Sequence, residues 1–224
     1  MPANRSYQRN REQVSFFRAI LLRWAKHNTA NFPWRNTTNR FHALIAEMML
    51  QRTKAEQVQP VYEEFVSRFP SADEAAQASQ ATLNKLLKSL GLEWRMKTIR
   101  QLVKTLAKRN GEIPSSFDEL IELPGVGDYV AAAFRTLHLN KSATLIDANI
   151  VRLYGRYFGI ETGPETRRDR RFRAFATAVQ PLRNIRTFGY ALLDFTRGVC
   201  TQRPRCIVCP LRQGCIFWKK AEKK

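Results

Sequence analysis

Leu123-Pro124-Gly125-Val126-Gly127 lies between two helical patterns, 116–123 and 128–137, and predicts a tight reversal between two helices. Pro124 ends the first helix, because the residue before a proline is disfavoured in the helical region. The two glycines permit the reversal and leave backbone N–H groups exposed where the second helix starts. Free N–H groups at the positive end of a helix dipole can hold a phosphate. For the pentapeptide alone, an ordinary turn between helices is the alternative interpretation.

Helical periodicity dominates the rest of the chain. In the segment 12–27, apolar side chains recur at i, i+3, i+4 and i+7, namely at Phe17, Ile20, Leu21 and Trp24. Further helices are predicted over 41–51, 55–69 and 148–158. Two pairs have the spacing of a capping box, Ser71 with Glu74 and Ser116 with Glu119. No segment alternates polar and apolar residues over the length of a strand, so the chain is predicted to be all-α.

The composition favours a polyanionic partner. Lys and Arg outnumber Asp and Glu by 38 to 19, which gives a formal net charge of +19 and a pI near 10.5. Cations on this scale favour nucleic acid, through counterion release at a phosphate backbone. No segment approaches the roughly 18 consecutive apolar residues of a membrane-spanning helix, and residues 1–11 contain no apolar signal region. We therefore expect no membrane association and a reducing intracellular compartment, the cytoplasm with its nucleoid.

The four cysteines of the chain lie within sixteen residues and have the spacing C-x5-C-x2-C-x5-C, as Cys200, Cys206, Cys209 and Cys215. In a reducing compartment, clustered cysteines bind metal more often than they form disulfides. Zinc sites usually have paired short C-x2-4-C loops, and here only one pair is that close. Four thiolates in a compact run also suit a [4Fe–4S] cluster. The spacing alone leaves zinc, an iron–sulfur cluster and disulfides as candidates.

Two carboxylates stand beside apolar runs. Asp147 follows Leu145-Ile146 and precedes the helix predicted over 148–158, where it can act as an N-cap, as a catalytic group, or as both. Glu47 lies within the apolar pattern of the helix predicted over 41–51. A charged side chain in such a position is costly unless it has a partner or a function.

Three motifs in this order resemble the helix-hairpin-helix DNA glycosylases of the endonuclease III superfamily: 123–129, 146–152 and the cysteine run. The resemblance extends from Phe32 to Cys215. It implies a two-lobed all-α fold, with a six-helix barrel and the hairpin over 36–141, and a lobe that joins 1–35 to 142–224. That second lobe would carry a [4Fe–4S] cluster on the four cysteines. The superfamily's usual spacing is C-x6-C-x2-C-x5-C, so the first interval is one residue shorter here.

Within this resemblance, the residue at position 129 indicates the type of glycosylase, and here it is Tyr129. Members that also cut the strand have a lysine at this position, and its amine forms a Schiff base with the sugar. A phenol cannot form an imine, so we expect a monofunctional enzyme that leaves an abasic site. Tyrosine here resembles the thymine/uracil mismatch glycosylases, which remove thymine or uracil opposite guanine. The alternative is an adenine DNA glycosylase acting on adenine opposite guanine or 8-oxoguanine, since those enzymes have a catalytic glutamate where Glu47 stands.

The resemblance also implies roles for individual residues. Asp147 would stabilise the cation that develops on the sugar and activate water, while Tyr129 and Glu47 would line the pocket for the extruded base. The expected contacts with DNA come from Gly125, Gly127, Gln51, Arg52 and Leu92. Of these, Arg52 and Leu92 are candidate wedges that fill the space left by the base. The expected partner is double-stranded DNA with a mismatched or damaged base, bound by a monomer.

Overall fold

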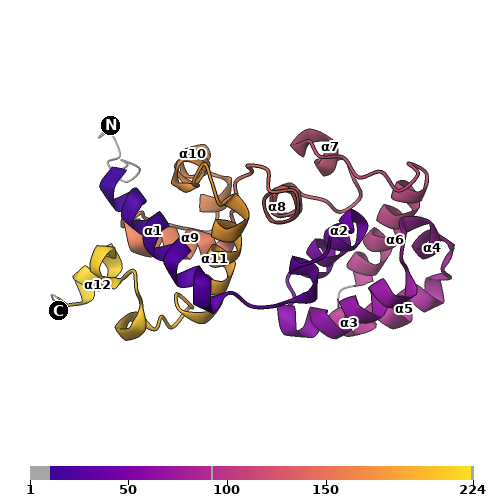
Figure 1. Cartoon of the computed structure of the whole chain (residues 1–224), viewed down its shortest axis with the longest axis horizontal. Helices are drawn as coiled ribbons and strands as arrows, with labels where there is room; N and C mark the ends of the chain where they lie inside the picture. Colours follow the sequence, from indigo (N-terminus) through magenta and orange to yellow (C-terminus); the bar gives the residue numbers. More distant parts are fainter. Residues whose placement is uncertain (1–10, 92, 223–224) are drawn as a thin grey trace. The chain divides into compact units, whose positions relative to one another are not determined.

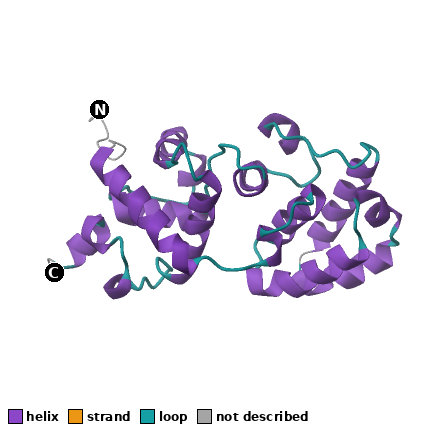
Figure 2. Ribbon diagram, in the orientation of Figure 1, coloured by secondary structure: helices purple, strands orange, loops and turns teal. Residues whose placement is uncertain are grey.

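The computed structural model describes residues 11–91 and 93–222. Within these ranges the chain consists of helices, turns and loops, and no residue is in a strand (Figures 1 and 2). The all-α prediction is confirmed. None of the described helices is both long and apolar enough to cross a membrane.

The chain divides into two compact units. Unit 1 comprises Met1–Ala30 and Asn140–Lys224, and unit 2 comprises Asn31–Leu139. Unit 1 contains α1 (Arg11–Asn28), α9 (Ala148–Phe158), η5 (Thr166–Arg168), α10 (Arg170–Val179), α11 (Ile185–Gly198), η6 (Cys206–Val208), η7 (Arg212–Gly214) and α12 (Ile216–Ala221). Unit 2 contains η2 (Pro33–Arg35), α2 (Arg40–Met49), α3 (Ala55–Arg68), α4 (Ala72–Gln77), α5 (Gln80–Leu87), η3 (Lys88–Leu90), α6 (Glu93–Ala107), α7 (Phe117–Ile121), α8 (Asp128–Ala133) and η4 (Phe134–His138).

Helix α2 is the central element of unit 2. Its residues from Ala43 to Met49 are all buried, and it packs against α3, α6, α8 and η4. Asn39 starts the helix, because its side chain accepts hydrogen bonds from the backbone N–H groups of Phe41 (2.9 Å) and His42 (3.2 Å). A helix that is buried on all sides fixes the positions of the elements around it. The turns that follow α2 are therefore held by a rigid support.

An aromatic cluster forms the core of unit 1. The ring of Phe17 on α1 packs against the rings of Tyr154, Tyr157, Phe158 and Phe188, with centroid separations of 4.8–6.3 Å. Phe17 is fully buried, and the contacts join α1 to α9 and α11. These rings bury much apolar area and add edge-to-face attraction, which holds α9 in place.

Several local predictions are confirmed by the backbone. Ser71 and Glu74 form a reciprocal capping box, and Ser116 accepts a hydrogen bond from the N–H of Glu119 (3.3 Å). The helix predicted over 148–158 is α9. The helix predicted over 128–137 is interrupted: α8 passes after Ala133 into a π-helical turn, η4. That turn carries His138, whose contact is described below.

Candidate functional site

Of the two hairpin glycines, Gly125 is required by the fold and Gly127 is not. Gly125 has φ +76°, and an added Cβ would lie 2.0 Å from Thr98 Cγ2 and 2.6 Å from Met48 Cε. Both the left-handed backbone and the close packing therefore exclude a side chain. Gly127 is the N-cap of α8 with φ −88°, and a Cβ there would meet no described atom within 4 Å. Gly127 is exposed, so its backbone is open to the approach of a ligand.

The turn after α2 lies against this hairpin. The Gln51 side-chain amide donates to the backbone carbonyl of Gly125 (3.3 Å), so two segments predicted to contact DNA are brought together within unit 2. Arg52 is exposed and has φ +57°, a left-handed conformation that costs an arginine about 1–2 kcal/mol. Tyr129 is half-buried on the first turn of α8. Leu92, the second predicted wedge, lies outside the described residues.

Arg95, on the first turns of α6, supports the turn after α2 from inside. Its side chain is 1% exposed, and its guanidinium donates to the backbone carbonyls of Met49 (3.1 Å) and Gln51 and to the hydroxyl of Thr53 (2.7 Å). Burial, and secondarily the neighbouring Arg52 cation, lower the pKa of Arg95 from its ordinary value. Sequence reasoning missed this residue, because its partners in the turn after α2 are more than forty positions away.

Glu47 is paired with a histidine that the sequence did not indicate. His138 Nε2 and Glu47 Oε1 are 2.8 Å apart, and the two side chains are 4% and 3% exposed. The pair joins α2 to η4 inside unit 2. A buried carboxylate is costly unless a hydrogen-bond donor satisfies it, and the imidazole meets that requirement. The apolar surroundings of Glu47 predicted that it needs a partner or a function, but nothing local in the sequence pointed to His138.

Asp147 is the N-cap of α9 in unit 1. Its Oδ1 accepts a hydrogen bond from the N–H of Ile150 (2.7 Å), and its Oδ2 accepts one from the side-chain amide of Asn149 (2.9 Å). Asn149 in turn accepts from Arg152 Nη1 (2.8 Å). The predicted capping role is confirmed, and this chain of bonds fixes the orientation of the carboxylate. Asp147 remains half-exposed.

Arg152 and Arg156 connect α9 to the cysteine loop. Arg152 donates to the backbone carbonyl of Cys200 (3.0 Å). Arg156 donates to the carbonyls of Thr201 (2.5 Å) and Gln202 (2.9 Å), and its guanidinium lies 5.1 Å from the centre of the Phe217 ring. These arginines satisfy carbonyl oxygens left without helical partners after α11 ends.

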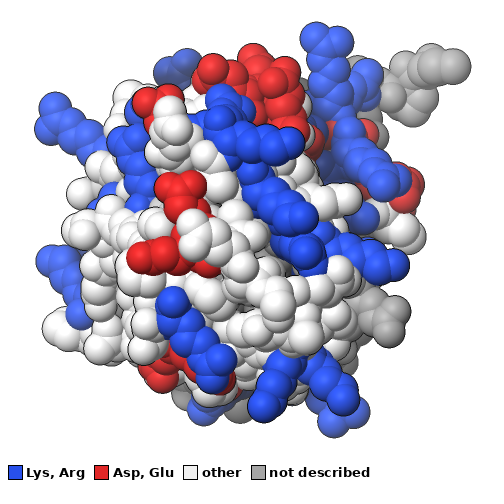
Figure 3. Space-filling model, turned by 90° about the vertical axis from the view of Figure 1, so that its right-hand side faces the viewer, with Lys and Arg blue, Asp and Glu red and all other residues white. Residues whose placement is uncertain are grey.

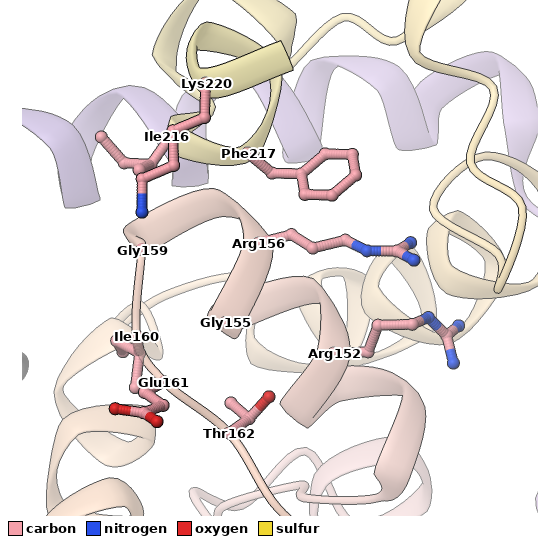
Figure 4. Close-up of a pocket in the computed structure, with 10 residues that line it drawn as sticks. All are labelled: Arg152, Gly155, Arg156, Gly159, Ile160, Glu161, Thr162, Ile216, Phe217 and Lys220. Atoms are coloured by element: carbon pink, nitrogen blue, oxygen red, sulfur yellow. The ribbon is translucent and has the colours of Figure 1, made fainter. Parts of the chain in front are cut away.

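A cavity of about 570 Å³ lies beside these arginines, between α9, the loop after it and α12 (Figure 4). It is lined by Arg152, Gly155, Arg156, Gly159, Ile160, Glu161, Thr162, Ile216, Phe217 and Lys220. In Figure 4 the two arginine side chains extend from α9 in the same direction, and the Phe217 ring lies close to Arg156. Both guanidinium groups are bonded to backbone carbonyls of the cysteine loop. This wall of the cavity therefore helps to hold the loop in place.

The four cysteines line one small, apolar-walled cavity in unit 1, together with side chains that include Leu153, Tyr157, Phe195 and Leu211. All four are free thiols in the structure. Burial raises the pKa of the Cys209 thiol to about 11, and repulsion from the other cysteines adds to the effect. Burial likewise raises the pKa values of Cys206 and Cys215. A protonated thiol binds a metal only when the metal cation replaces its proton.

The donor set has the chemistry of an iron–sulfur site. Among the described residues, no three His, Cys, Asp or Glu side chains converge on a point that one metal ion could occupy. A [4Fe–4S] cluster would be held by four cysteine thiolates. Four cysteines around one cavity have the right ligand type and number for this arrangement.

Basic side chains are spread over the surface. Figure 3, which views the molecule from the right-hand side of Figure 1, shows Lys and Arg side chains across the viewed face with Asp and Glu among them. In unit 1 a basic cluster surrounds the start of α10, formed by Arg167, Arg168, Arg170, Arg171 and Arg173. Phe172 and Phe175 of the same segment are buried, so the aromatic residues of this segment pack inward while the arginines surround the start of the helix.

Comparison with known proteins identifies the family. Residues 45–176 match the HhH-GPD superfamily of base excision DNA repair proteins. The chain belongs to this superfamily. A thymine/uracil-DNA glycosylase of Pyrobaculum aerophilum is 35% identical over 217 residues, which cover 92% of this chain and 94% of that protein. A thymine-DNA glycosylase of Aeropyrum pernix is 34% identical, with coverages of 92% and 96%. The solved structure of a thermostable thymine-DNA glycosylase matches with a TM-score of 0.86 at 28% identity, over 93% of this chain and 98% of that one.

The HhH-GPD match includes the hairpin and the two carboxylates, Glu47 and Asp147. The cysteine run, 200–215, lies beyond the matched segment. The two glycosylases named above align with more than nine-tenths of this chain.

The two hairpin glycines are expected to respond differently to the same change. Gly125→Ala should lower the free energy of unfolding by at least about 2 kcal/mol, from left-handed strain and the clash with Thr98 and Met48. Gly127→Ala should cost less than about 1 kcal/mol, the loss of a favourable N-cap residue, while weakening binding to duplex DNA. Urea unfolding and fluorescence polarisation with a labelled duplex measure the two effects. Equal destabilisation by both substitutions would contradict the assignment.

Proposed function

We propose that this protein is a monofunctional DNA glycosylase that removes thymine or uracil opposite guanine in duplex DNA by hydrolysing the N-glycosidic bond. The observation that carries the proposal is Tyr129, two residues after the last hairpin glycine, in a chain that also has a carboxylate at the start of α9. Support comes from the relatives named thymine/uracil-DNA and thymine-DNA glycosylase, which align over nearly the full length of this chain.

Base release begins with extrusion of the target nucleotide from the duplex. Unstacking and unpairing cost a few kcal/mol, and the cost is lowest for a mispaired base, so extrusion itself favours mismatches. In this proposal the hairpin N–H groups beside Gly127 hold a backbone phosphate. The turn 51–53 and Leu92 occupy the space that the base leaves. The net charge of +19 attracts the duplex as a whole, and one copy of the chain suffices to bind it.

Asp147 is the proposed catalytic residue. As the base leaves with the bonding electrons, positive charge develops on the sugar, and an ionised carboxylate nearby stabilises it. The same carboxylate orients water and accepts its proton, so that the water oxygen bonds to C1′ and an abasic site remains. The hydrogen bonds from Ile150 and Asn149 hold the carboxylate in one orientation before the substrate arrives.

Tyr129 and Glu47 are the proposed residues of the base pocket. Tyr129 can stack on the extruded base or hydrogen-bond to it, but its phenol cannot form an imine with C1′. Glu47 would hold a water or hydrogen-bond to the base, with its orientation set by His138. No strand cleavage is expected from this set of residues.

The four cysteines are the proposed ligands of a [4Fe–4S] cluster. When bound, the group cross-links the loop from Cys200 to Cys215 by four iron–thiolate bonds, and it has no part in base hydrolysis. The shorter first interval, 201–205, places Thr201 and Gln202 where Arg156 donates to their carbonyls. Because such ligands must stay reduced, a reducing compartment, the cytoplasm with its nucleoid, is the proposed location.

The substrate is tested with four duplexes that contain T:G, U:G, A:8-oxoguanine or thymine glycol, each treated with the protein and then with or without alkali. The proposal predicts strand breaks on T:G and U:G, and only after alkali. Breaks confined to the A:8-oxoguanine duplex would move the protein to the adenine DNA glycosylases. Breaks without alkali would show a lyase activity that Tyr129 does not explain.

Asp147→Asn separates the catalytic role from the capping role. Asparagine caps a helix about as well as aspartate, so the midpoint of thermal unfolding should change little. Loss of the charge should reduce single-turnover release of uracil from U:G at least roughly a hundredfold, while duplex affinity stays near that of the wild type. Asp169→Asn is a matched control, because Asp169 caps α10 in the same way through the N–H of Phe172 (2.8 Å). If the two variants have the same activity, Asp147 is a cap and nothing more.

Chemical analysis tests the cysteine site. Protein purified without oxygen should contain about four iron and four sulfide per chain, as the cluster formula requires. Cys209→Ser should reduce the iron content and lower the unfolding midpoint. One zinc per chain and no sulfide would instead identify a zinc site.

A further inference from the structure

Arg95 is a buried cation whose partners come from two separate turns of unit 2. Its Nη1 donates to Met49 O (3.1 Å) and Thr53 Oγ1 (2.7 Å), and its Nη2 donates to Gln51 O, all in or next to the turn after α2. The same Nη1 lies 3.5 Å from Leu90 O, at the end of η3. One guanidinium thus bonds to the turn after α2 and to the turn that leads into α6.

Core packing alone does not explain why the Arg95 cation is buried, because burying a charge costs free energy. None of the partners of Arg95 among the described residues is a carboxylate, its Nε has no hydrogen-bond partner, and the Arg52 cation lies close enough to repel it. A buried charge without a counter-ion is expensive, and an apolar side chain of similar volume would fill the same space at lower cost. The guanidinium supplies instead several hydrogen bonds in a fixed planar geometry.

The turn after α2 carries residues that the proposed function assigns to DNA contact and insertion. Gln51 and Arg52 lie in the first turn, and the backbone of Arg52 is held in the left-handed region at φ +57°. Gly91, with φ +69°, follows Leu90 in the second turn and directly precedes Leu92. The left-handed backbone is unfavourable for Arg52, whereas glycine adopts a positive φ without strain. The carbonyl bonds from Arg95 hold the first turn and anchor the start of the second.

We propose that Arg95 is a positioning residue that holds the turn after α2 to the turn that leads into α6, so that Arg52 is positioned to enter the duplex when the base is extruded. The inference rests on the proposed function, because it concerns how the target base is exposed. Arg95 does not touch DNA itself. Arg95 contributes to extrusion of the base and not to hydrolysis. Loss of its hydrogen bonds should therefore slow base release most when the base must still be unstacked.

Two duplexes separate extrusion from hydrolysis. One contains uracil opposite guanine, and the other has the same sequence with uracil in a bubble of three unpaired nucleotides. Single-turnover release is measured for the wild type, Arg95→Met, Arg95→Lys and Thr53→Val. Arg100→Met is the matched control: it removes the same charge from the same helix, where Arg100 bonds to the Gln80 side chain. Thr53→Val removes one hydrogen bond to Arg95 with little change of shape, and it serves if Arg95→Met does not fold.

The expected result is a loss specific to the paired base. Arg95→Met should slow release from the U:G duplex roughly tenfold to a hundredfold, the penalty for a displacement on the order of 1 Å. Release from the bubble should change less than about twofold, since extrusion costs least when the base is already unpaired. Arg95→Lys and Thr53→Val should show smaller losses of the same kind, because each retains part of the bonding. Arg100→Met should behave as the wild type on both duplexes.

Equal losses of Arg95→Met on both duplexes, or a fall matched by Arg100→Met, would overturn the proposal. A 2-aminopurine placed next to the target reports extrusion directly by its fluorescence, and the signal should fall in Arg95→Met and Thr53→Val. If the wild type releases base from neither duplex, the proposed function fails. In that case the 2-aminopurine signal by itself tests the role of Arg95. A signal that is unchanged in Arg95→Met and in Thr53→Val would refute the proposed positioning role.

Discussion

The hydrogen bonds from Arg152 and Arg156 to backbone carbonyls are the constraint on which the cysteine segment of unit 1 depends. The segment after α11 has little apolar burial of its own, since Ile207 and Val208 are 79% and 63% exposed and Leu211 is its main buried aliphatic side chain. Such a segment is not ordered by the hydrophobic effect. The arginines order it from α9, the helix that also begins at Asp147. The carboxylate and the thiol site therefore share one rigid support.

The two carboxylates occupy different environments, and their proposed roles differ accordingly. Asp147 is half-exposed at the start of a helix, with both oxygens accepting hydrogen bonds from its own turn. Glu47 lies within a buried helix and is paired with an imidazole. Carboxylates in unlike surroundings can take different parts in one reaction. The first suits stabilisation of a cation and the second suits recognition of a base.

Local signals predicted the helices well and the long-range contacts poorly. The bounds of α9 were predicted to the residue, because Asp147 caps its start and an apolar stripe continues to Phe158. The Gly125 turn was predicted because left-handed backbone requires glycine. The pairing of Glu47 with His138 spans 91 positions, and the bonds of Arg95 to the turn after α2 span more than forty. No periodicity encodes such partners, so the sequence showed that Glu47 needs compensation without showing what provides it.

The central claim is that this HhH-GPD protein releases a base by hydrolysis, with Tyr129 in place of an imine-forming amine. Incubation with a labelled T:G duplex in the presence of borohydride tests it most directly, because borohydride traps any Schiff base as a covalent protein–DNA complex. The account predicts free thymine, an intact abasic strand and no covalent complex. A trapped complex, or a strand cut without alkali, would contradict it.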